Sequence, residues 1–302
     1  MTTEFVKMRD GKDVYVTYWD CANPRAAVVM VHGMCEYIAR YDDFCTFLNH
    51  NGYGVIGMDN RSFGMTDADS RGYGTDGMFE NTVDDIKQEV DMARERFGVK
   101  NVYVIGHSYG SILTQRFIEK YHESVSGAIL CGSTMQSGIM LWLGRKIARR
   151  GAKKNPDKDG KFFAKMTFAS YDKKICEGKS GWINRDKAEV EKYNADEQCA
   201  GVGACSYMFY REMLDGCARI NKRRADTPSD FKLMIASGTA DGCGGYGKLI
   251  KRLVKAYKKK SGIIPIVKMY EGARHELLNE INKGEVYEDF LQFLNDCEGK
   301  TE

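Results

Sequence analysis

One stretch of the chain has the residue types and the spacing of a reactive serine: it reads G-x-S-x-G, with Ser108 in the middle. The β-branched and aromatic run 101–105 before it predicts a buried strand, and residues 111–122 after it carry apolar side chains at helical spacing. A serine on a tight strand-to-helix turn is a nucleophile elbow, in which glycines leave room for neighbouring backbone. We therefore predict that Ser108 is a nucleophile and that Gly106 and Gly110 are its elbow glycines.

A serine hydroxyl needs a base to take its proton and an acid to orient that base. Of the five histidines, His275 follows the last predicted strand, at the sheet edge where a base is needed. The acid should end a strand between the serine and the histidine in chain order, and Asp241 fits that position. Asp226 and Asp230 compete with it, but both precede the strand instead of following it.

The other four histidines are not predicted to be the base. His32 and His107 lie in loops beside the expected site, and His107, directly before the serine, should point away from it. His50 and His122 end helices away from the site. His275 is therefore the only predicted base.

The negative charge of a tetrahedral intermediate needs N–H donors that are already in place. The backbone N–H of Tyr109, next after the nucleophile, should be one of them. The backbone N–H of Met34, in the loop after the predicted strand 26–31, should be the other. This chemistry requires no cofactor and no metal.

Strands and helices alternate along most of the chain, which predicts an α/β fold with a mostly parallel central sheet covered on both faces. Residues 4–20, with Asp10-Gly11 at the turn, add an N-terminal antiparallel hairpin. Residues 134–227 contain no clear buried strand and are predicted to be an inserted helical cap. The core is then made of residues 1–133 and 228–302. The predicted strands are 26–31, 53–58, 101–105, 127–131, 232–236 and 266–270, and the predicted helices are 41–50, 82–97, 111–122, 249–257 and 286–294.

Composition excludes several classes of protein. A chain of 302 residues with 43% hydrophobic and 29% charged residues is typical of one large globular fold. The net charge of only +3 does not indicate a nucleic-acid-binding protein. The N-terminal residues have no apolar core of a signal peptide, so we expect a cytoplasmic protein whose ten cysteines are reduced.

Motifs along the chain together resemble a known family. They are residues 32–36 (HGMCE) with Arg40-Tyr41, 59–67 (DNRSFGMTD), the 106–110 elbow, 238–241 (GTAD) and 271–276 (EGARHE). In this order they are similar to the monoacylglycerol lipase and lysophospholipase branch of the α/β-hydrolases, which is often grouped with serine aminopeptidases. The resemblance covers about residues 26–131 and 228–296.

The resemblance implies an α/β-hydrolase fold, and the family's nucleophile, acid, base and one oxyanion donor match the residues predicted above. Asn60, Ser62 and Phe63 depart from the family, which carries a histidine and a Gly-His-Gly pattern there. This departure leaves catalysis intact but leaves the wall of the substrate pocket undefined. The cap resembles the family in position only, so it does not define the substrate.

We predict a serine hydrolase that cleaves carboxylic esters through an acyl-enzyme. Small amphipathic esters, monoacylglycerols or lysophospholipids, are the substrates that the resemblance implies. Two other classes stay open: a serine aminopeptidase on the same three residues, with an acidic cap group for the substrate amine, and a non-catalytic ligand-binding hydrolase fold.

Two motifs could indicate other functions, dinucleotide binding and zinc binding, but neither interpretation is adopted. Residues 242–247 match the G-x-G-x-x-G dinucleotide pattern, but 52–57 and 72–77 match it as well, and the first glycine of 242–247 lies too far beyond its strand. Residues 275–279 nearly spell the zinc motif H-E-x-x-H, but an asparagine replaces the second histidine.

Residues 141–165 are rich in lysine and arginine and contain only two acidic residues, Asp157 and Asp159. The simplest interpretation is a solvated basic face. The alternative is peripheral contact between the cap and an anionic lipid surface, which charge reversal at Arg149 and Arg150 tests.

Overall fold

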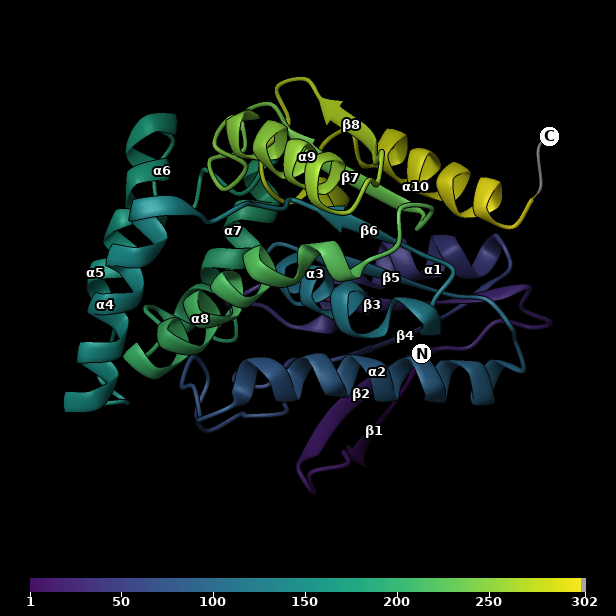
Figure 1. The fold of residues 1–302 in the computed structure, drawn as a ribbon, viewed down its shortest axis with the longest axis horizontal. Coiled ribbons are helices and arrows are strands. Elements are labelled where there is room, and N and C mark those ends of the chain that lie inside the picture. Colours follow the sequence, from purple (N-terminus) through teal and green to yellow (C-terminus); the bar gives the residue numbers. More distant parts are fainter. Residues whose placement is uncertain (300–302) are drawn as a thin grey trace.

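The computed structural model describes residues 1–299 and places one eight-stranded sheet at the centre of the molecule (Figure 1). The strand order is β1-β2-β4-β3-β5-β6-β7-β8, and every neighbouring pair from β4 to β8 is parallel. The predicted mostly parallel sheet is confirmed. The strands are β1 (Thr2–Lys7), β2 (Asp13–Trp19), β3 (Ala26–Val31), β4 (Tyr53–Met58), β5 (Val102–His107), β6 (Gly127–Cys131), β7 (Leu233–Gly238) and β8 (Ile266–Tyr270).

The N-terminal hairpin of β1 and β2 forms the antiparallel edge of the sheet. β1 pairs antiparallel with β2, and β2 pairs antiparallel with β4. The turn between them contains Gly11 at a φ of 88°, a backbone conformation that favours glycine. This hairpin was predicted and is confirmed.

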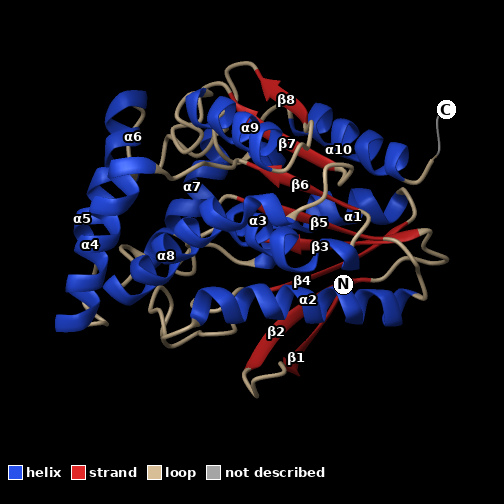
Figure 2. Cartoon of the chain, viewed as in Figure 1, coloured by secondary structure: helices blue, strands red, loops and turns tan. Residues whose placement is uncertain are grey.

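Helices cover both faces of the sheet (Figure 2). One face packs against α1 and α10, and the other packs against α2, α3 and α9. None of the helices in residues 1–299 is long and apolar enough to cross a membrane. The helices that cover the sheet are α1 (Asp42–His50), α2 (Met78–Phe97), α3 (Tyr109–Tyr121), α9 (Lys248–Lys260) and α10 (Lys283–Cys297).

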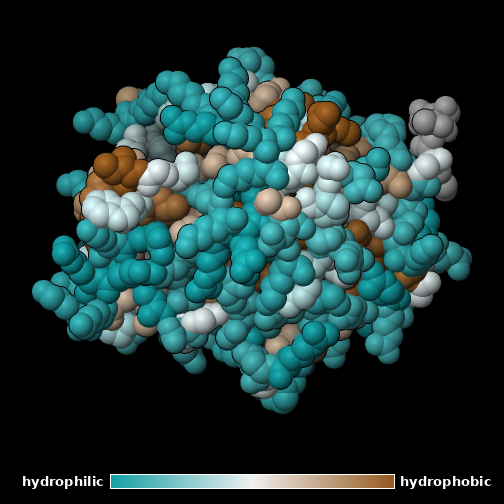
Figure 3. Space-filling view, in the orientation of Figure 1, coloured by the Kyte–Doolittle hydropathy of each residue, from teal (hydrophilic) through white to brown (hydrophobic). Residues whose placement is uncertain are grey.

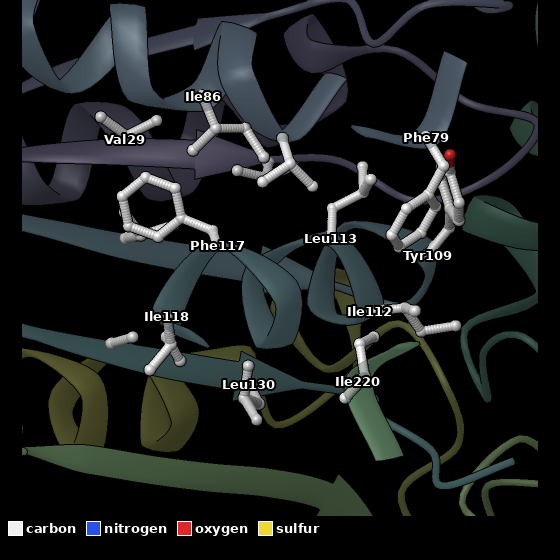
Figure 4. Close-up of a cluster of buried hydrophobic side chains, with 14 of the residues drawn as sticks. Val29, Phe79, Ile86, Tyr109, Ile112, Leu113, Phe117, Ile118, Leu130 and Ile220 are labelled. Carbon is white, nitrogen blue, oxygen red and sulfur yellow. The ribbon is translucent and has the colours of Figure 1, made fainter. Parts of the chain in front are cut away.

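Helix α3 lies at the centre of the larger core and starts at the predicted nucleophile. Its side chains Leu113 and Phe117 are fully buried, and Figure 4 shows them directed toward β3 and α2. Ile118 of the same helix lies on the side of β6 (Figure 4). Because α3 is packed on several sides, the turn in front of it has little freedom to move.

The segment between β6 and β7 is helical, where the sequence predicts the inserted cap. Helix α8 packs against α2 and α3 of the core and against α4, while α4, α5 and α6 lie together at one end of the molecule (Figure 1). The boundaries of the three predicted domain segments stay a prediction, and residues 300–302 of the last one lie outside the described residues. The helices of the segment are α4 (Gly138–Lys154), α5 (Lys161–Met166), α6 (Phe168–Ile175), α7 (Lys187–Ala195) and α8 (Tyr207–Arg223).

Candidate active site

Ser108 lies on the sharp turn between β5 and α3. Its φ of 52° and ψ of −116° are strained for a residue with a side chain, as a nucleophile elbow requires. A Cβ on Gly110 would lie 2.2 Å from the carbonyl oxygen of Val31, and one on Gly106 would lie 2.2 Å from Thr114 Oγ1. Both positions therefore exclude any larger residue at this turn.

The structure brings together the predicted nucleophile, base and acid. His275 Nε2 lies 2.8 Å from Ser108 Oγ, and His275 Nδ1 lies 3.1 Å from both carboxylate oxygens of Asp241. Asp241 is fully buried and also accepts the backbone N–H of Cys243 at 2.8 Å. With Nδ1 donating to the carboxylate, Nε2 is left as the acceptor of the serine proton. The arrangement can move a proton from a hydroxyl as that hydroxyl attacks a carbonyl.

The rival acids and most of the other histidines lie away from this chemistry. Asp226 ends the short helical turn that follows α8, Asp230 lies in the loop before β7, and both are exposed. His50 ends α1, and His122 follows the end of α3. The predicted orientation of His107 is observed: its two ring nitrogens face Glu36, Tyr41 and the carbonyl of His275 instead of Ser108.

The two predicted oxyanion donors lie on either side of Ser108. Within residues 1–299, neither the Met34 nor the Tyr109 backbone N–H donates to another group of the chain. Tyr109 is the first residue of α3, so its N–H has no acceptor within the helix and lies at the positive end of the helix dipole. A Cβ on Gly33 would lie 3.0 Å from Ser108 Cβ, which shows how closely the Met34 loop approaches the serine.

A cavity of about 150 Å³ adjoins Ser108 and is walled on one side by cap residues. The ring of Trp182 lies 4.9 Å from that of His275, and Phe168 stacks on Trp182 at 5.3 Å. Asp172 also lines the cavity, but its carboxylate accepts the backbone N–H groups of Ser180 and Trp182 at 3.0 and 3.4 Å. These residues were not predicted from the sequence, because Trp182 lies outside any helix or strand and Phe168 and Asp172 lie on α6, a helix of only eight residues.

A buried polar cluster beside the cavity was also missed. Glu36 Oε2 accepts from Arg40 Nη1 at 2.9 Å, and Arg40 holds both carboxylate oxygens of Glu276 at 2.7 and 2.9 Å. These residues stand in the motifs that carry the family resemblance, and that was the only signal for them. The cluster joins the loop after β3 to the loop that carries His275.

The segment with Asn60, Ser62 and Phe63 does not line the cavity. Asn60 hydrogen-bonds His32, and the ring of Phe63 is buried against Tyr109. These three residues that depart from the family therefore belong to the core beneath the site.

Ligand atoms suited to a metal come together at one place in residues 1–299, where Asp241, Cys243 and His275 offer atoms within 4.8 Å of one another. The first and last of these already form the acid–base pair described above. The glycine-rich residues 242–247 pack against the cap, because a Cβ on Gly242 would lie 2.6 Å from the ring of Tyr171. The carboxylate of Glu276, in the zinc-like motif, is bound by Arg40.

A family model described as serine aminopeptidase S33 matches residues 22–282. The chain belongs to this family. The S33 family assignment agrees with the predicted resemblance, and the relatives of the chain include ester hydrolases. Monoglyceride lipase from Mus musculus is 25% identical over 281 residues, covering 90% of this chain and 82% of that protein. Phospholipase YtpA from Bacillus subtilis is 23% identical over 281 residues, covering 92% and 98%.

Solved structures confirm the α/β-hydrolase fold of this S33 chain. A thermostable carboxyl esterase from Bacillus coagulans superposes with a TM-score of 0.89 at 20% identity and covers 98% of each chain. A soluble variant of monoglyceride lipase from Saccharomyces cerevisiae superposes with a TM-score of 0.75 at 20% identity, covering 98% of this chain and 95% of that one.

Proposed function

We propose that the chain is a serine hydrolase that cleaves carboxylic esters of the monoacylglycerol or lysophospholipid type. The observation that carries this proposal is the hydrogen-bonded series from Ser108 Oγ through His275 to Asp241, at 2.8 and 3.1 Å. The names of the relatives, a monoglyceride lipase and a phospholipase, support the class of substrate.

In this mechanism Ser108 Oγ attacks the ester carbonyl while His275 Nε2 takes its proton. The backbone N–H groups of Met34 and Tyr109 stabilise the negative charge that forms on the carbonyl oxygen. His275 then protonates the leaving alcohol, which gives an acyl-enzyme, and water activated by the same imidazole releases the acid. Asp241 holds the imidazole in the tautomer that both steps need.

The cavity favours short or medium acyl chains. Its volume of about 150 Å³ is below the range of roughly 300–1,000 Å³ that is common for sites of drug-sized ligands. Phe168 and Trp182 bound it on the cap side. A long acyl chain would therefore require the cap to move.

An aminopeptidase on the same residues is the second candidate, and the presence of Asp172 in the cavity favours it. A free carboxylate there would bind the amine of a peptide substrate. Because two backbone N–H groups already bind this carboxylate, ester hydrolysis is the better supported activity.

A panel of p-nitrophenyl esters from butyrate to palmitate, run beside aminoacyl-anilides, tests the proposal. We expect ester turnover, with kcat/KM falling as the acyl chain lengthens, and labelling by a fluorophosphonate. Preferential turnover of the anilides would favour the peptidase. Absence of both turnover and labelling would favour a non-catalytic fold.

We also propose that the cap makes peripheral contact with an anionic lipid surface through α4 and α5. Large apolar side chains are exposed there, and Ile139 is 70% exposed. Figure 3 shows apolar surface gathered at the end of the molecule where α4–α6 lie. The exposed apolar residues of these two helices are Ile139, Met140, Trp142, Leu143, Phe162 and Met166.

Charge complementarity selects an anionic bilayer as the partner. Helix α4 contains no acidic residue, and its C-terminal half is basic. Arg145 and Arg149 pair with Asp215, whereas Arg150, Lys153 and Lys154 are exposed. An apolar surface bordered by free cations is typical of helices that lie in a membrane interface.

Reversal of Arg150, Lys153 and Lys154 to glutamate is expected to weaken co-sedimentation with phosphatidylserine vesicles. Each cation near such a surface contributes about 1 kcal/mol, so the loss should be about a hundredfold or more at low salt. The matched control reverses Lys255, Lys258 and Lys259 on α9, which changes the net charge equally elsewhere. An equal loss in both variants, or no loss in the first, would contradict this contact.

A further inference from the structure

His107 is a buried histidine without a role in the proposed chemistry. It lies between two loops that have one, the loop with Met34 and the loop with His275. Its side chain is 3% exposed. Nδ1 lies 3.0 Å from Glu36 Oε1 and 2.8 Å from the Tyr41 hydroxyl, and Nε2 lies 3.2 Å from the backbone carbonyl oxygen of His275. Both ring nitrogens therefore face oxygen atoms.

The number of donors and acceptors around His107 determines its protonation. A carbonyl oxygen only accepts, so Nε2 must carry a proton to bond to His275. The Tyr41 hydroxyl has one proton and lies 2.8 Å from Glu36 Oε1, which also only accepts when ionised. With a neutral ring, the Tyr41 proton could go either to Nδ1 or to Glu36, and in both cases no proton would lie between Nδ1 and Glu36 Oε1, which are 3.0 Å apart. A ring protonated on both nitrogens satisfies every contact.

His32, buried beside it, shows the opposite pattern. Its Nδ1 lies 2.7 Å from the carbonyl oxygen of Gly33, so that nitrogen donates. Its Nε2 accepts the backbone N–H of Asn60 at 2.7 Å, so the ring is neutral. Burial lowers the pKa of His32. Burial also acts to lower the pKa of His107, but the hydrogen bond and the charge of Glu36 outweigh it and raise that pKa.

The charges of the buried cluster support the same conclusion. Glu36 and Glu276 are two carboxylates that share one guanidinium, Arg40. A protonated His107 makes the cluster neutral, whereas a neutral ring leaves one uncompensated negative charge. That charge would lie beside the Met34 loop, where it would oppose the formation of an oxyanion.

We infer that His107 is a positioning residue, an imidazolium paired with Glu36 that holds the oxyanion loop and the backbone of the catalytic base in one geometry. Glu36 Oε1 accepts the Gly33 N–H at 2.6 Å, in the peptide next to Met34. His107 holds the carbonyl of His275 from the other side. One ion pair thus connects both halves of the site, and this role rests on the proposed esterase function.

The first test measures the proton directly and does not need an active enzyme. Nitrogen-15 NMR of the imidazole rings in the Ser108→Ala protein should show both His107 nitrogens protonated from pH 6 to 8. Glu36→Gln should make that ring neutral within the same range. A neutral His107 in the Ser108→Ala protein would overturn the inference. The charged or titratable groups nearest the ring are Glu36, Arg40, Tyr41, Glu276, His275, His32 and, on the neighbouring strand, Cys131.

The second test separates positioning from folding. His107→Gln keeps a donor but no charge, and we expect kcat for a short ester to fall about a hundredfold, as for a misplaced oxyanion donor, with little change in KM. The control, His50→Gln at the exposed end of α1, should keep full activity. Full kcat in His107→Gln would overturn the positioning role. If that variant does not fold, the NMR experiment decides alone, because it uses the intact ring.

Discussion

Replacement of Ser108 by alanine is expected to abolish ester hydrolysis while the fold persists. The hydroxyl makes its one side-chain hydrogen bond, at 2.8 Å, to His275 Nε2, so its loss removes the nucleophile and no structural contact. Removal of a catalytic serine lowers kcat on the order of 10⁵- to 10⁶-fold in comparable enzymes. Turnover of p-nitrophenyl butyrate and the thermal unfolding midpoint would be measured on the same preparation.

The matched control for this variant is Ser70→Ala, at an exposed serine in the loop before α2. It should keep the activity of the unmodified chain and react with a fluorophosphonate, whereas Ser108→Ala should not react. Activity retained by a well-folded Ser108→Ala protein would rule out the proposed mechanism. Loss of activity in both variants would point to an effect of the preparation. The result with Ser108→Ala would then no longer support the proposed mechanism.

Replacement of Asp241 by asparagine is expected to have the second largest effect. The amide can donate a proton toward His275 Nδ1, which favours the tautomer with the proton on Nε2. In that tautomer Nε2 cannot take the serine proton, and the loss of kcat should be roughly 10⁴-fold. Because Asp241 is fully buried and asparagine has nearly the same shape, the site should stay assembled. Fluorophosphonate labelling of Ser108 should therefore slow without a large change in melting temperature.

Asp230→Asn provides the comparison, since Asp230 was one of the two rival acids and is exposed in the loop before β7. We expect the Asp230→Asn protein to turn over p-nitrophenyl butyrate as fast as the unmodified chain. If Asp230→Asn and Asp241→Asn lost activity equally, the contact between Asp241 and His275 would not be the one that orients the base. A selective loss in Asp241→Asn at both neutral and alkaline pH would support the orienting role.

Several elements were predictable because their signal is local. The bounds of β3, β4, β6 and β8 agree with the predicted strands, since each is a short run of strand-forming residues bounded by turn residues. Helix α2 begins at Met78, four residues before the predicted start, because Met78 and Phe79 continue the buried face. The elbow was predictable for the same reason: strand, turn and helix are consecutive in the chain.

The cap was predictable as an insertion but not in its detail. Helix α7 has little apolar periodicity, and α6 has only eight residues, with Phe168, Tyr171 and Ile175 half-buried along one face, so neither helix offers a long pattern by which it could be recognised. Trp182, which covers the ring of His275, lies between them in a segment without periodicity. Its place beside the base depends on how the segment packs, and no local pattern encodes that.

By itself, the sequence determined the sheet, its covering helices and the three residues proposed for catalysis, because hydrophobic periodicity and chain order place strand ends at a common edge. Only the tertiary structure decided what surrounds them. Glu36 meets His107 across 71 positions of chain, and Arg40 meets Glu276 across 236. Such contacts depend on the closeness of side chains in space, and therefore the contacts from which we infer the charge of His107 are present only in the folded chain.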